Sequence, residues 1–357
     1  MLRRKSFPIH RILILNAAGI GDFVMATPAL LSIRKGYPTV QITLLTTPQV
    51  ETLANFQPFV DEILTFDLRR YRPERHGIGW GSAKNFWQLT RQLRLKAFDL
   101  VISLHQMTTT GAFRLYAFLT LIQARQNAGR WNRGLGLFFG IRANDRPHEV
   151  DAMLAITTCL GCPHITMHPI LALPEFISQM ALTRLLDIGL SAKEPFIILN
   201  IGSNRPEARL PEDVATSLAG AIRQFTEAPF VLTGDAREAA AVRSIASRIG
   251  GRCYSLAGQT SMAELTGILA AASVVVTTDT GPMHIAAALG TPLVALFGPA
   301  SPVNTGPRTQ PGLAVVLEGQ AQPRHPLRWH RNLRLDVAAE AVSRFLTSSR
   351  VAGRIHL

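Results

Sequence analysis

The stretch VTTDTGPMH, residues Val276–His284, decides the predicted fold. It reads as the end of an apolar strand, then an acidic and hydroxyl-bearing turn, then a helix opened by a proline. A second apolar strand, Leu293–Phe297, and a Gly-Pro loop follow it. Such turns lie at the carboxyl end of a parallel strand, where the N-terminus of the next helix favours anions. The stretch therefore predicts a parallel α/β sheet with an anion-binding edge.

The residue types in this turn suit a sugar that carries a diphosphate. Asp279 can accept hydrogen bonds from sugar hydroxyls, while Thr280 and the helix amides from Gly281 onward can donate to phosphate oxygens. His284 lies one turn into the helix, and Met283 precedes it. A lone histidine is more often structural than functional, but its neighbours here favour a binding role.

Short apolar strands alternate with helices along the whole chain. Strands of this kind are typical of a parallel sheet that is covered on both faces. Prolines 163, 169 and 174 interrupt the alternation, which then restarts. We therefore predict two doubly wound α/β domains, 1–168 and 169–357, and the last helix is a candidate to pack back on the first domain. Two stretches, Asp67–Gly81 and Asn127–Pro147, are predicted to be irregular.

The composition favours anionic partners. The 357 residues include 37 Lys and Arg against 24 Asp and Glu, a formal net charge of +13. The basic residues are scattered and only 7% of residues are aromatic, so a membrane surface or a phosphorylated glycolipid is favoured over nucleic acid. A generally basic surface without a specific partner is the alternative.

Membrane-spanning and export signals are not expected. No apolar run approaches the ~20 residues that span a bilayer. The basic start Met1–Lys5 precedes a short apolar piece, Ile12–Leu15, which is better interpreted as a first strand than as a signal peptide. We expect a cytoplasmic protein, peripheral on the cytoplasmic face of the inner membrane.

The segment CLGCPHITMH, Cys159–His168, has the residue types of a metal cluster. However, an apolar helix, Val150–Leu160, ends there, with Gly161 and Pro163 as ordinary stop residues. The four ligand types also crowd into ten residues, which leaves little room for a zinc loop. We therefore predict no metal site, and three cysteines in the whole chain fit a reducing compartment.

The first strand leads into NAAGIGDFV, Asn16–Val24, a glycine turn at the start of a helix. Gly19 and Gly21 match the first two glycines of a dinucleotide fingerprint, but the third position is Val24, and no acidic residue follows the second strand. These two failures argue against a nicotinamide cofactor. Asp22 lies in the first turn of the helix, and its local pattern favours a capping role.

A third strand end carries GSNRPEARLP, Gly202–Pro211. Arg205 and Arg209 lie four residues apart there, and arginine binds phosphate in a bidentate manner. The alternative is that both arginines pair on the surface with Glu207 and Glu212. The position at a strand end and the neighbouring residues favour phosphate binding. We include the adjacent Ser203 and Asn204 in the predicted site.

The next strand ends at an acidic pair, Asp235 and Glu238. The pair suits contacts with a ribose or a base, and it also fits an ordinary charge pattern at a helix N-terminus. The sequence contains no Ser-His-Asp order, Walker loop, His-Glu-x-x-His motif or paired metal-binding carboxylates. A bound diphosphate would therefore be neutralised by helix dipoles and cationic side chains.

Taken together, these segments resemble glycosyltransferase family 9, the lipopolysaccharide heptosyltransferases. The resemblance runs nearly end to end and is carried by Ile12–Leu30, Gly202–Pro211, Asp279–Gly290 and Leu296–Pro299. It implies a GT-B fold, in which two Rossmann-like domains face each other across a cleft. It also implies an inverting transfer of heptose from ADP-heptose to an anionic lipopolysaccharide inner-core acceptor, without a cofactor or an obligatory metal.

The resemblance assigns roles to individual residues. Asp22 matches the proposed general base, and the C-terminal domain holds the donor. In that family the residues matched by Asp279, Thr280, Gly281 and His284 contact the donor. Together with the residues singled out above, the predicted donor-binding set is Ser203, Asn204, Arg205, Arg209, Glu238, Asp279, Thr280, Gly281, Met283 and His284.

The chain departs from the family pattern in two places. Family members often carry a hydroxyl residue before the Gly-Asp pair, where this chain has Ala17–Gly19, and a lysine where it has Ala208. Arg205 or Arg209 is a candidate to replace that lysine. Alternatives are a family-9 transferase for another sugar nucleotide or acceptor, a nucleotide-sugar epimerase of the same fold, or a non-catalytic binding protein.

Overall fold

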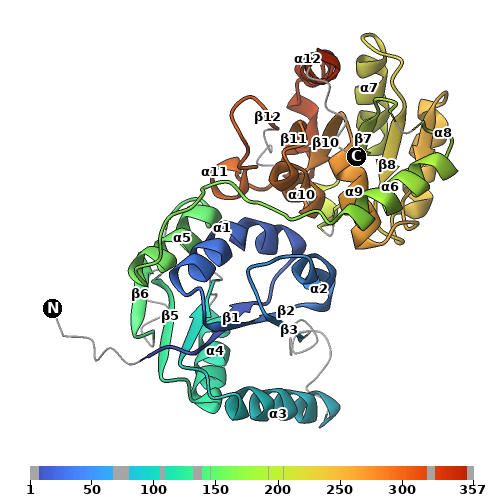
Figure 1. Ribbon diagram of the computed structural model, residues 1–357. Coiled ribbons are helices and arrows are strands. Elements are labelled where there is room, and N and C mark those ends of the chain that lie inside the picture. Colours follow the sequence, from blue (N-terminus) through green and yellow to red (C-terminus); the bar gives the residue numbers. More distant parts are fainter. Residues whose placement is uncertain are drawn as a thin grey trace. The chain divides into compact units, whose positions relative to one another are not determined.

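The computed structural model describes residues 8–66, 80–104, 109–131, 139–144, 146–191, 193–203, 205–319 and 326–351. The chain forms two compact units, Met1–Met167 and His168–Leu357. Each unit contains one six-stranded sheet with helices on its faces (Figure 1). The predicted α/β fold of two doubly wound, Rossmann-like units is therefore confirmed.

The sheet of the first unit has the strand order β3-β2-β1-β4-β5-β6, and all its strand pairs are parallel. Helices α1, α2 and α5 cover one face, and α3 and α4 cover the other (Figure 1). The elements are β1 (Arg11–Asn16), α1 (Ile20–Gly36), β2 (Gln41–Thr46), α2 (Pro48–Asn55), β3 (Glu62–Thr65), α3 (Trp80–Leu95), β4 (Leu100–Ser103), α4 (Thr109–Ile122), β5 (Gln126–Trp131), β6 (Ile141–Asn144) and α5 (Glu149–Cys159).

The second unit repeats this arrangement with the order β12-β11-β10-β7-β8-β9, again all parallel. Helix α12 packs against α7 and against strands β10 to β12 of its own unit. The elements are α6 (Glu175–Asp187), β7 (Ile197–Asn200), η2 (Pro206–Ala208), α7 (Glu212–Arg223), β8 (Phe230–Thr233), α8 (Ala239–Ile249), β9 (Cys253–Ser255), α9 (Met262–Ala271), β10 (Val274–Thr278), α10 (Gly281–Leu289), β11 (Leu293–Phe297), α11 (Pro302–Thr305), β12 (Ala314–Glu318), η3 (Pro326–Asn332) and α12 (Leu335–Val351).

Strand order decides where each unit can bind a ligand. In both sheets the winding direction reverses between the first and fourth strands, which are β1 and β4 in one unit and β7 and β10 in the other. Loops on the two sides of such a reversal diverge and leave a crevice outside the carboxyl ends of the strands. Three segments follow these ends: the glycine turn after β1 (Ala17–Gly21), the arginine loop after β7 (Gly202–Pro211) and the Asp279 turn after β10 (Asp279–Gly281).

Helix α1 contains an internal proline whose missing N–H is compensated locally. Pro28 cannot donate to the carbonyl of Val24, four residues earlier. The hydroxyl of Thr27 donates to that carbonyl instead, at 2.7 Å. The helix therefore continues through Pro28 to Gly36 with this buried carbonyl satisfied.

The prediction that Asn127–Pro147 is irregular is wrong, because β5 and β6 lie in it. Strand β5 has few apolar residues, and its buried Arg130 is matched by a residue far along the chain. The Arg130 guanidinium donates to Glu149 at 2.6 Å, and its side chain is only 2% exposed. The predicted loop Asp67–Gly81 lies outside the described residues up to position 79, and α3 begins at Trp80.

The segment Cys159–His168 forms the end of a helix, as its stop residues predict. Helix α5 ends at Cys159, and Gly161 adopts the left-handed conformation with φ 76°. Burial raises the pKa of the Cys162 thiol to about 11, so this sulfur stays protonated at neutral pH. Within the described ranges, no group of three or more His, Cys, Asp or Glu side chains could hold a metal ion.

In the part of the chain that the structure describes, no helix has both the length and the apolar character to cross a bilayer.

Candidate functional site

Three strand ends of the second unit are joined by the side chain of Asn200. Its Nδ2 donates to the hydroxyl oxygens of Thr277 and Thr280, both at 3.1 Å, and its Oδ1 accepts from the Thr233 hydroxyl at 3.1 Å. Asn200 is 4% exposed and lies in register with Thr233 on one side and Thr277 on the other. The carboxyl ends of β7, β8 and β10 are thus fixed by one amide. Asn200 is not among the residues predicted from the sequence, although polar residues that end successive apolar strands are a visible signal.

The Asp279 turn and the arginine loop are joined by an ion pair. The Arg205 Nη2 atom lies 3.2 Å from Asp279 Oδ2, and the Asp279 side chain is only 10% exposed. The other carboxylate oxygen lies 3.9 Å from His284 Nε2. A hydrogen bond from the Thr278 hydroxyl to the Gly202 carbonyl, 2.9 Å long, ties the same two segments together. The structure therefore brings together three of the predicted residues at one edge of the sheet.

Glu238 binds the backbone and one side chain of the arginine loop. Its carboxylate accepts from the backbone N–H of Ser203 at 2.9 Å and of Asp235 at 3.1 Å, and Arg209 Nε lies 3.4 Å away. The fit is close, because a Cβ on Gly202 would lie 2.2 Å from a carboxylate oxygen of Glu238. In addition to its position at the start of α8, Glu238 therefore fixes the loop that follows β7.

Asp235 follows the ordinary pattern of a helix N-terminus. Its carboxylate accepts from the backbone N–H of Arg237 at 2.8 Å and of Glu238 at 3.1 Å, and it pairs with the Arg237 guanidinium. Burial works to raise the pKa of Asp235, but the Arg237 guanidinium and the backbone donors lower it overall. Of the acidic pair, Glu238 is thus the member that reaches the arginine loop.

The two arginines do not pair with Glu207 and Glu212, so that alternative is wrong. Arg209 Nε donates to the Ser203 carbonyl at 2.8 Å, and its ion-pair partner is Glu238. Glu212 pairs with Arg248 instead, at 3.6 Å. Both loop arginines therefore face the edge of the sheet, where the acidic residues of the site lie.

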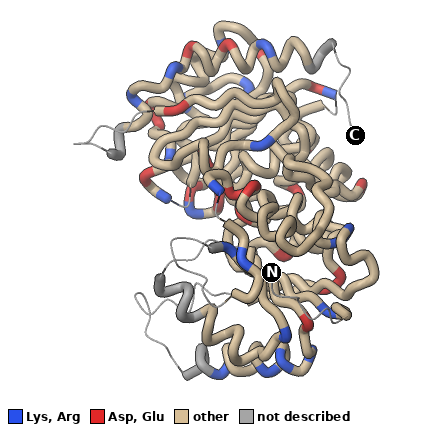
Figure 2. The backbone as a smooth tube through the Cα atoms, turned by 90° about the vertical axis from the view of Figure 1, so that its left-hand side faces the viewer, with Lys and Arg blue, Asp and Glu red and all other residues tan. Residues whose placement is uncertain are grey.

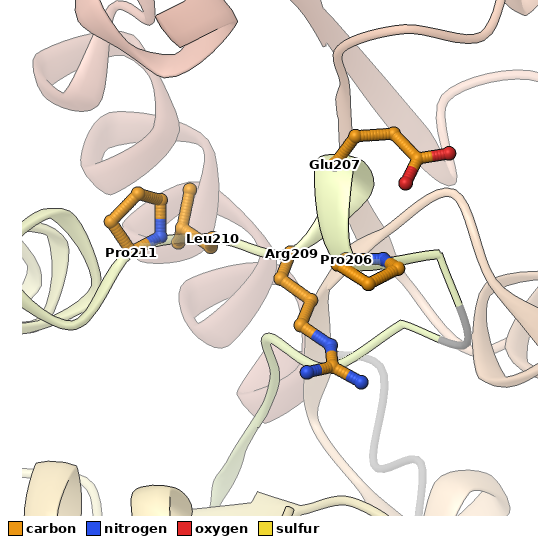
Figure 3. A pocket seen from close by; sticks show the side chains of 5 residues that line it. All are labelled: Pro206, Glu207, Arg209, Leu210 and Pro211. Carbon is orange, nitrogen blue, oxygen red and sulfur yellow. The ribbon is translucent and has the colours of Figure 1, made fainter. Parts of the chain in front are cut away.

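A pocket of about 330 Å³ lies at the same loop and is lined by Pro206, Glu207, Arg209, Leu210 and Pro211. Figure 3 shows the Arg209 guanidinium extending away from the side chain of Glu207. Ala208, where the related family often has lysine, is only 3% exposed within the 3-10 turn η2. The cationic groups available here are therefore those of the flanking arginines.

Helix α10 directs its N-terminus at the Arg205–Asp279 pair. Thr280 is the N-cap residue, but its hydroxyl bonds Asn200 and the Thr278 carbonyl and does not cap the helix. Met283 is fully buried and His284 is 5% exposed, so both pack inside this end of the helix. Asn204 lies outside the described residues. A helix N-terminus beside an arginine is a suitable place for phosphate oxygens.

In the first unit, Asp22 closes the glycine turn after β1. Asp22 is partly exposed, and its Oδ2 accepts from the backbone N–H of Gly19 at 2.9 Å. The Thr47 hydroxyl donates to the Ala18 carbonyl at 3.0 Å and holds the other side of the turn. The structure thus shows the capping contact that the local pattern predicts for Asp22. It also places this carboxylate at the carboxyl edge of the first sheet.

The comparisons with known proteins agree with each other. The sequence model described as glycosyltransferase family 9 (heptosyltransferase) matches residues 86–327. The chain is similar to the lipopolysaccharide core heptosyltransferase OpsX of Haemophilus influenzae, with 24% identity over 92% of this chain and 94% of the relative. It is also similar to lipopolysaccharide heptosyltransferase 2 of Escherichia coli K12, with 26% identity over 86% of this chain and 88% of the relative.

Among solved structures, the fold is similar to that of the E. coli ADP-heptose lipopolysaccharide heptosyltransferase II. The TM-score is 0.75 at 22% sequence identity, and the match covers 95% of this chain and 99% of the other. Two doubly wound units in one chain are thus the shared architecture.

Proposed function

Because the chain belongs to glycosyltransferase family 9, the heptosyltransferase family, we propose that it transfers a heptose from ADP-heptose to the inner core of lipopolysaccharide. The relatives at 24% and 26% identity are named as lipopolysaccharide heptosyltransferases, which supports the sugar and the acceptor class. The observation that carries the proposal is the pairing of Arg205 with Asp279 at the N-terminus of α10. This arrangement offers a cation and helix amides to a diphosphate and a carboxylate to a sugar.

In this proposal the second unit binds the donor. Arg205, Arg209 and the N-terminus of α10 neutralise the diphosphate, because charge-assisted hydrogen bonds and the helix dipole both favour phosphate oxygens. The arginines take the place of the lysine that is absent at Ala208. The full donor-binding set is Ser203, Asn204, Arg205, Arg209, Glu238, Asp279, Thr280, Gly281, Met283 and His284, in which buried Met283 supports the helix from within.

The first unit supplies the acceptor side and the base. Asp22 accepts the proton of an acceptor hydroxyl while that oxygen attacks the anomeric carbon of the heptose and the bond to ADP breaks with inversion. The negative charge that develops on the leaving ADP is stabilised by the arginines and the helix terminus. The acceptor is an anionic glycolipid at the cytoplasmic face of a membrane, and the net charge of +13 favours such a partner.

The test is an incubation of the protein with ADP-heptose and a truncated lipopolysaccharide core as acceptor. Mass spectrometry of the lipid should show the addition of one heptose and the release of ADP. A product with the heptose isomerised but no acceptor modified would instead indicate an epimerase. Binding of ADP-heptose without turnover would overturn the catalytic proposal and leave a binding protein.

The nucleotide and the sugar are tested in the same assay with other donors. Replacement of ADP-heptose by its GDP and UDP counterparts and by ADP-glucose should lower the rate of transfer. A higher rate with one of these donors would contradict the assignment of ADP-heptose and keep the transferase.

A further inference from the structure

The outer surface of α3 carries cationic and apolar side chains together. Lys84, Trp87, Arg91, Arg94 and Leu95 are all exposed, with Trp87 at 61% and Leu95 at 74%. At 3.6 residues per turn these five positions fall within about 100° of the helix circumference. The Arg91 guanidinium lies over the Trp87 ring, 5.6 Å from its centroid. One stripe of the helix is therefore both basic and aromatic.

The opposite side of α3 is fully used by the core, so this stripe is free of the sheet. Leu89 and Leu93 are buried among the residues that cover one face of the first sheet. Phe86 packs against Phe118 of α4, with ring centroids 6.1 Å apart. Helices α3 and α4 thus form one layer, and Tyr116 of α4 is 55% exposed on its outer side. We call Lys84, Trp87, Arg91, Arg94, Leu95 and Tyr116 the α3–α4 face.

Acidic side chains are nearly absent from this layer. Between residues 84 and 125 the sequence has six basic residues (Lys84, Arg91, Arg94, Lys96, Arg114 and Arg125) and one acidic residue, Asp99. Asp99 is 6% exposed and is turned inward, where it accepts from the backbone N–H groups of His10 and Arg11. Glu62 of the adjacent strand pairs with Lys96 at 2.7 Å. Helix α3 lies at the bottom of Figure 1, and in Figure 2 the described part of the lowest edge shows Lys and Arg and no Asp or Glu.

We propose that the α3–α4 face docks on the surface of an anionic lipid bilayer. Tryptophan and tyrosine prefer the level of the lipid headgroups, where the ring is apolar on one side and wet on the other. Lysine and arginine beside them are attracted to anionic headgroups and can bury their aliphatic stems. A helix with one apolar-basic stripe lies in the plane of the interface and does not span the membrane.

The helices that form the α3–α4 face begin at the carboxyl edge of the first sheet. Helices α3 and α4 follow β3 and β4 and run back along the sheet, so their first turns lie at its carboxyl edge. Asp22 lies at the same edge. Docking by this face would therefore hold the carboxyl edge of the first sheet beside the membrane that carries the acceptor. This last step rests on the proposed function, whereas the docking itself does not.

Vesicle flotation tests the proposal directly with the full-length protein. Binding to phosphatidylcholine vesicles should be weak, and replacing part of this lipid with phosphatidylglycerol should strengthen it and make it salt-sensitive. The variant Trp87→Ser with Arg91→Gln and Arg94→Gln should bind the anionic vesicles at least about 25-fold more weakly, since each cation near the surface contributes about fivefold. Binding that is equal for neutral and anionic vesicles, or no binding to either, would overturn the proposal.

A matched variant on the second unit is the control. Phe225→Ser with Arg243→Gln and Arg248→Gln removes one exposed aromatic residue and two exposed arginines, and it should bind vesicles like the wild type. An equal loss in both variants would show that only net charge matters, which contradicts a specific face. Because the first variant can fail to fold, a second measurement uses lipids brominated near the headgroup. They should quench the emission of the wild type, and the quenching should be weaker in Trp87→Phe.

An activity arm separates this proposal from the proposed function. On a water-soluble acceptor fragment the triple variant (Trp87→Ser, Arg91→Gln, Arg94→Gln) should transfer heptose at the wild-type rate. On acceptor in anionic vesicles it should transfer heptose more slowly than the wild type. Vesicle binding without any transfer would leave the docking intact and overturn only the proposed function. Equal rates for wild type and variant on vesicle-bound acceptor would contradict the link between docking and acceptor access.

Discussion

Strands β1 and β7 occupy the same place in their sheets, and both end in an asparagine, Asn16 or Asn200. Each asparagine is in register with a threonine at the end of the neighbouring strand, Thr46 or Thr233. Asn200 bonds three threonine hydroxyls. Asn16 is completely buried, and in the described parts of the chain neither end of its amide finds a hydrogen-bond partner.

The difference comes from the fourth strand of each sheet. In the second unit β10 places Thr277 beside Asn200. In the first unit β4 ends at Ser103, opposite Leu15, so the apolar Leu104 follows beside Asn16. A buried polar group without a partner costs about 1–3 kcal/mol. The proposed donor side is thus fixed by its own hydrogen bonds, whereas among the described residues of the proposed acceptor side the Asn16 amide, six positions before Asp22, has no partner.

The largest expected difference between the two units is the loss of turnover on substitution of Asp22 in the first unit. Asp22→Asn should lower turnover by roughly 10²–10⁴-fold, the contribution of a general base. The affinity for ADP should be unchanged, because the proposed donor groups all belong to the second unit. Transfer rates and calorimetric titration with ADP measure the two quantities.

The capping contact of Asp22 provides the control for this substitution. An asparagine oxygen can still accept from the Gly19 amide, so the melting temperature should hardly change. Asp213→Asn alters another aspartate in the first turn of a helix and should leave turnover as it is. If Asp22→Asn were as active as Asp213→Asn, Asp22 would be a capping residue only.

The next effect concerns the second unit. Arg209→Ala should weaken ADP binding about 10- to 100-fold, since a hydrogen bond to a charged group contributes about 1.5–3 kcal/mol. Arg248→Ala is matched in exposure, at 49% against 42%, and in having a glutamate partner, and it should bind ADP normally. Wild-type affinity in the Arg209 variant would mean that this arginine only stabilises the loop.

The two asparagines can be compared directly by the same substitution. Asn200→Val should lower the free energy of unfolding by about 1–3 kcal/mol, because the buried Thr233 hydroxyl loses its acceptor and the Thr277 and Thr280 hydroxyls each lose one donor. Asn16→Val removes an amide that has none in the described structure, so stability should be unchanged or rise by about 1 kcal/mol. Urea unfolding of both variants measures the difference. Equal losses would show that Asn16 has a partner in the folded protein.

The smallest expected effect sharpens the role of Glu238. Gly202→Ala places a Cβ at 2.2 Å from the Glu238 carboxylate, which must move and release the Ser203 amide. ADP binding should weaken severalfold, with a loss of stability of about 1 kcal/mol. Gly220→Ala in α7 meets no atom within 4 Å and should instead stabilise the protein by about 0.5–1 kcal/mol. An unchanged ADP affinity in Gly202→Ala would contradict a role of this contact in donor binding.

The parts of the fold that sequence could predict were those with local signals. Continuous apolar runs predicted most of the parallel strands, and Gly161 and Pro163 predicted the end of α5. Strand β5 was not predicted because its buried Arg130 is neutralised by Glu149, nineteen residues away. A charge that is satisfied at a distance looks like an exposed charge in the sequence.

The candidate site divides in the same way. The Asp279 turn and the arginine loop are contiguous motifs and were predicted, but they are paired through Arg205 and Asp279, which lie 74 residues apart. Asn200 was missed because an asparagine at the end of a strand has no meaning until β8 and β10 are placed beside it. Strand order, rather than local propensity, creates that part of the site.

Trp329 of η3 determines how late in translation the arginine loop can be completed. Its indole is fully buried against Gly298 and Gly319, and its Nε1 donates to the Glu207 carbonyl, 122 residues earlier, at 2.9 Å. A chain emerging from the ribosome can therefore pair β7 to β12 before this bond exists. The arginine loop reaches its final form only after residue 329 has been translated. A premature stop before residue 329 would leave this loop without the bond that holds its Glu207 carbonyl.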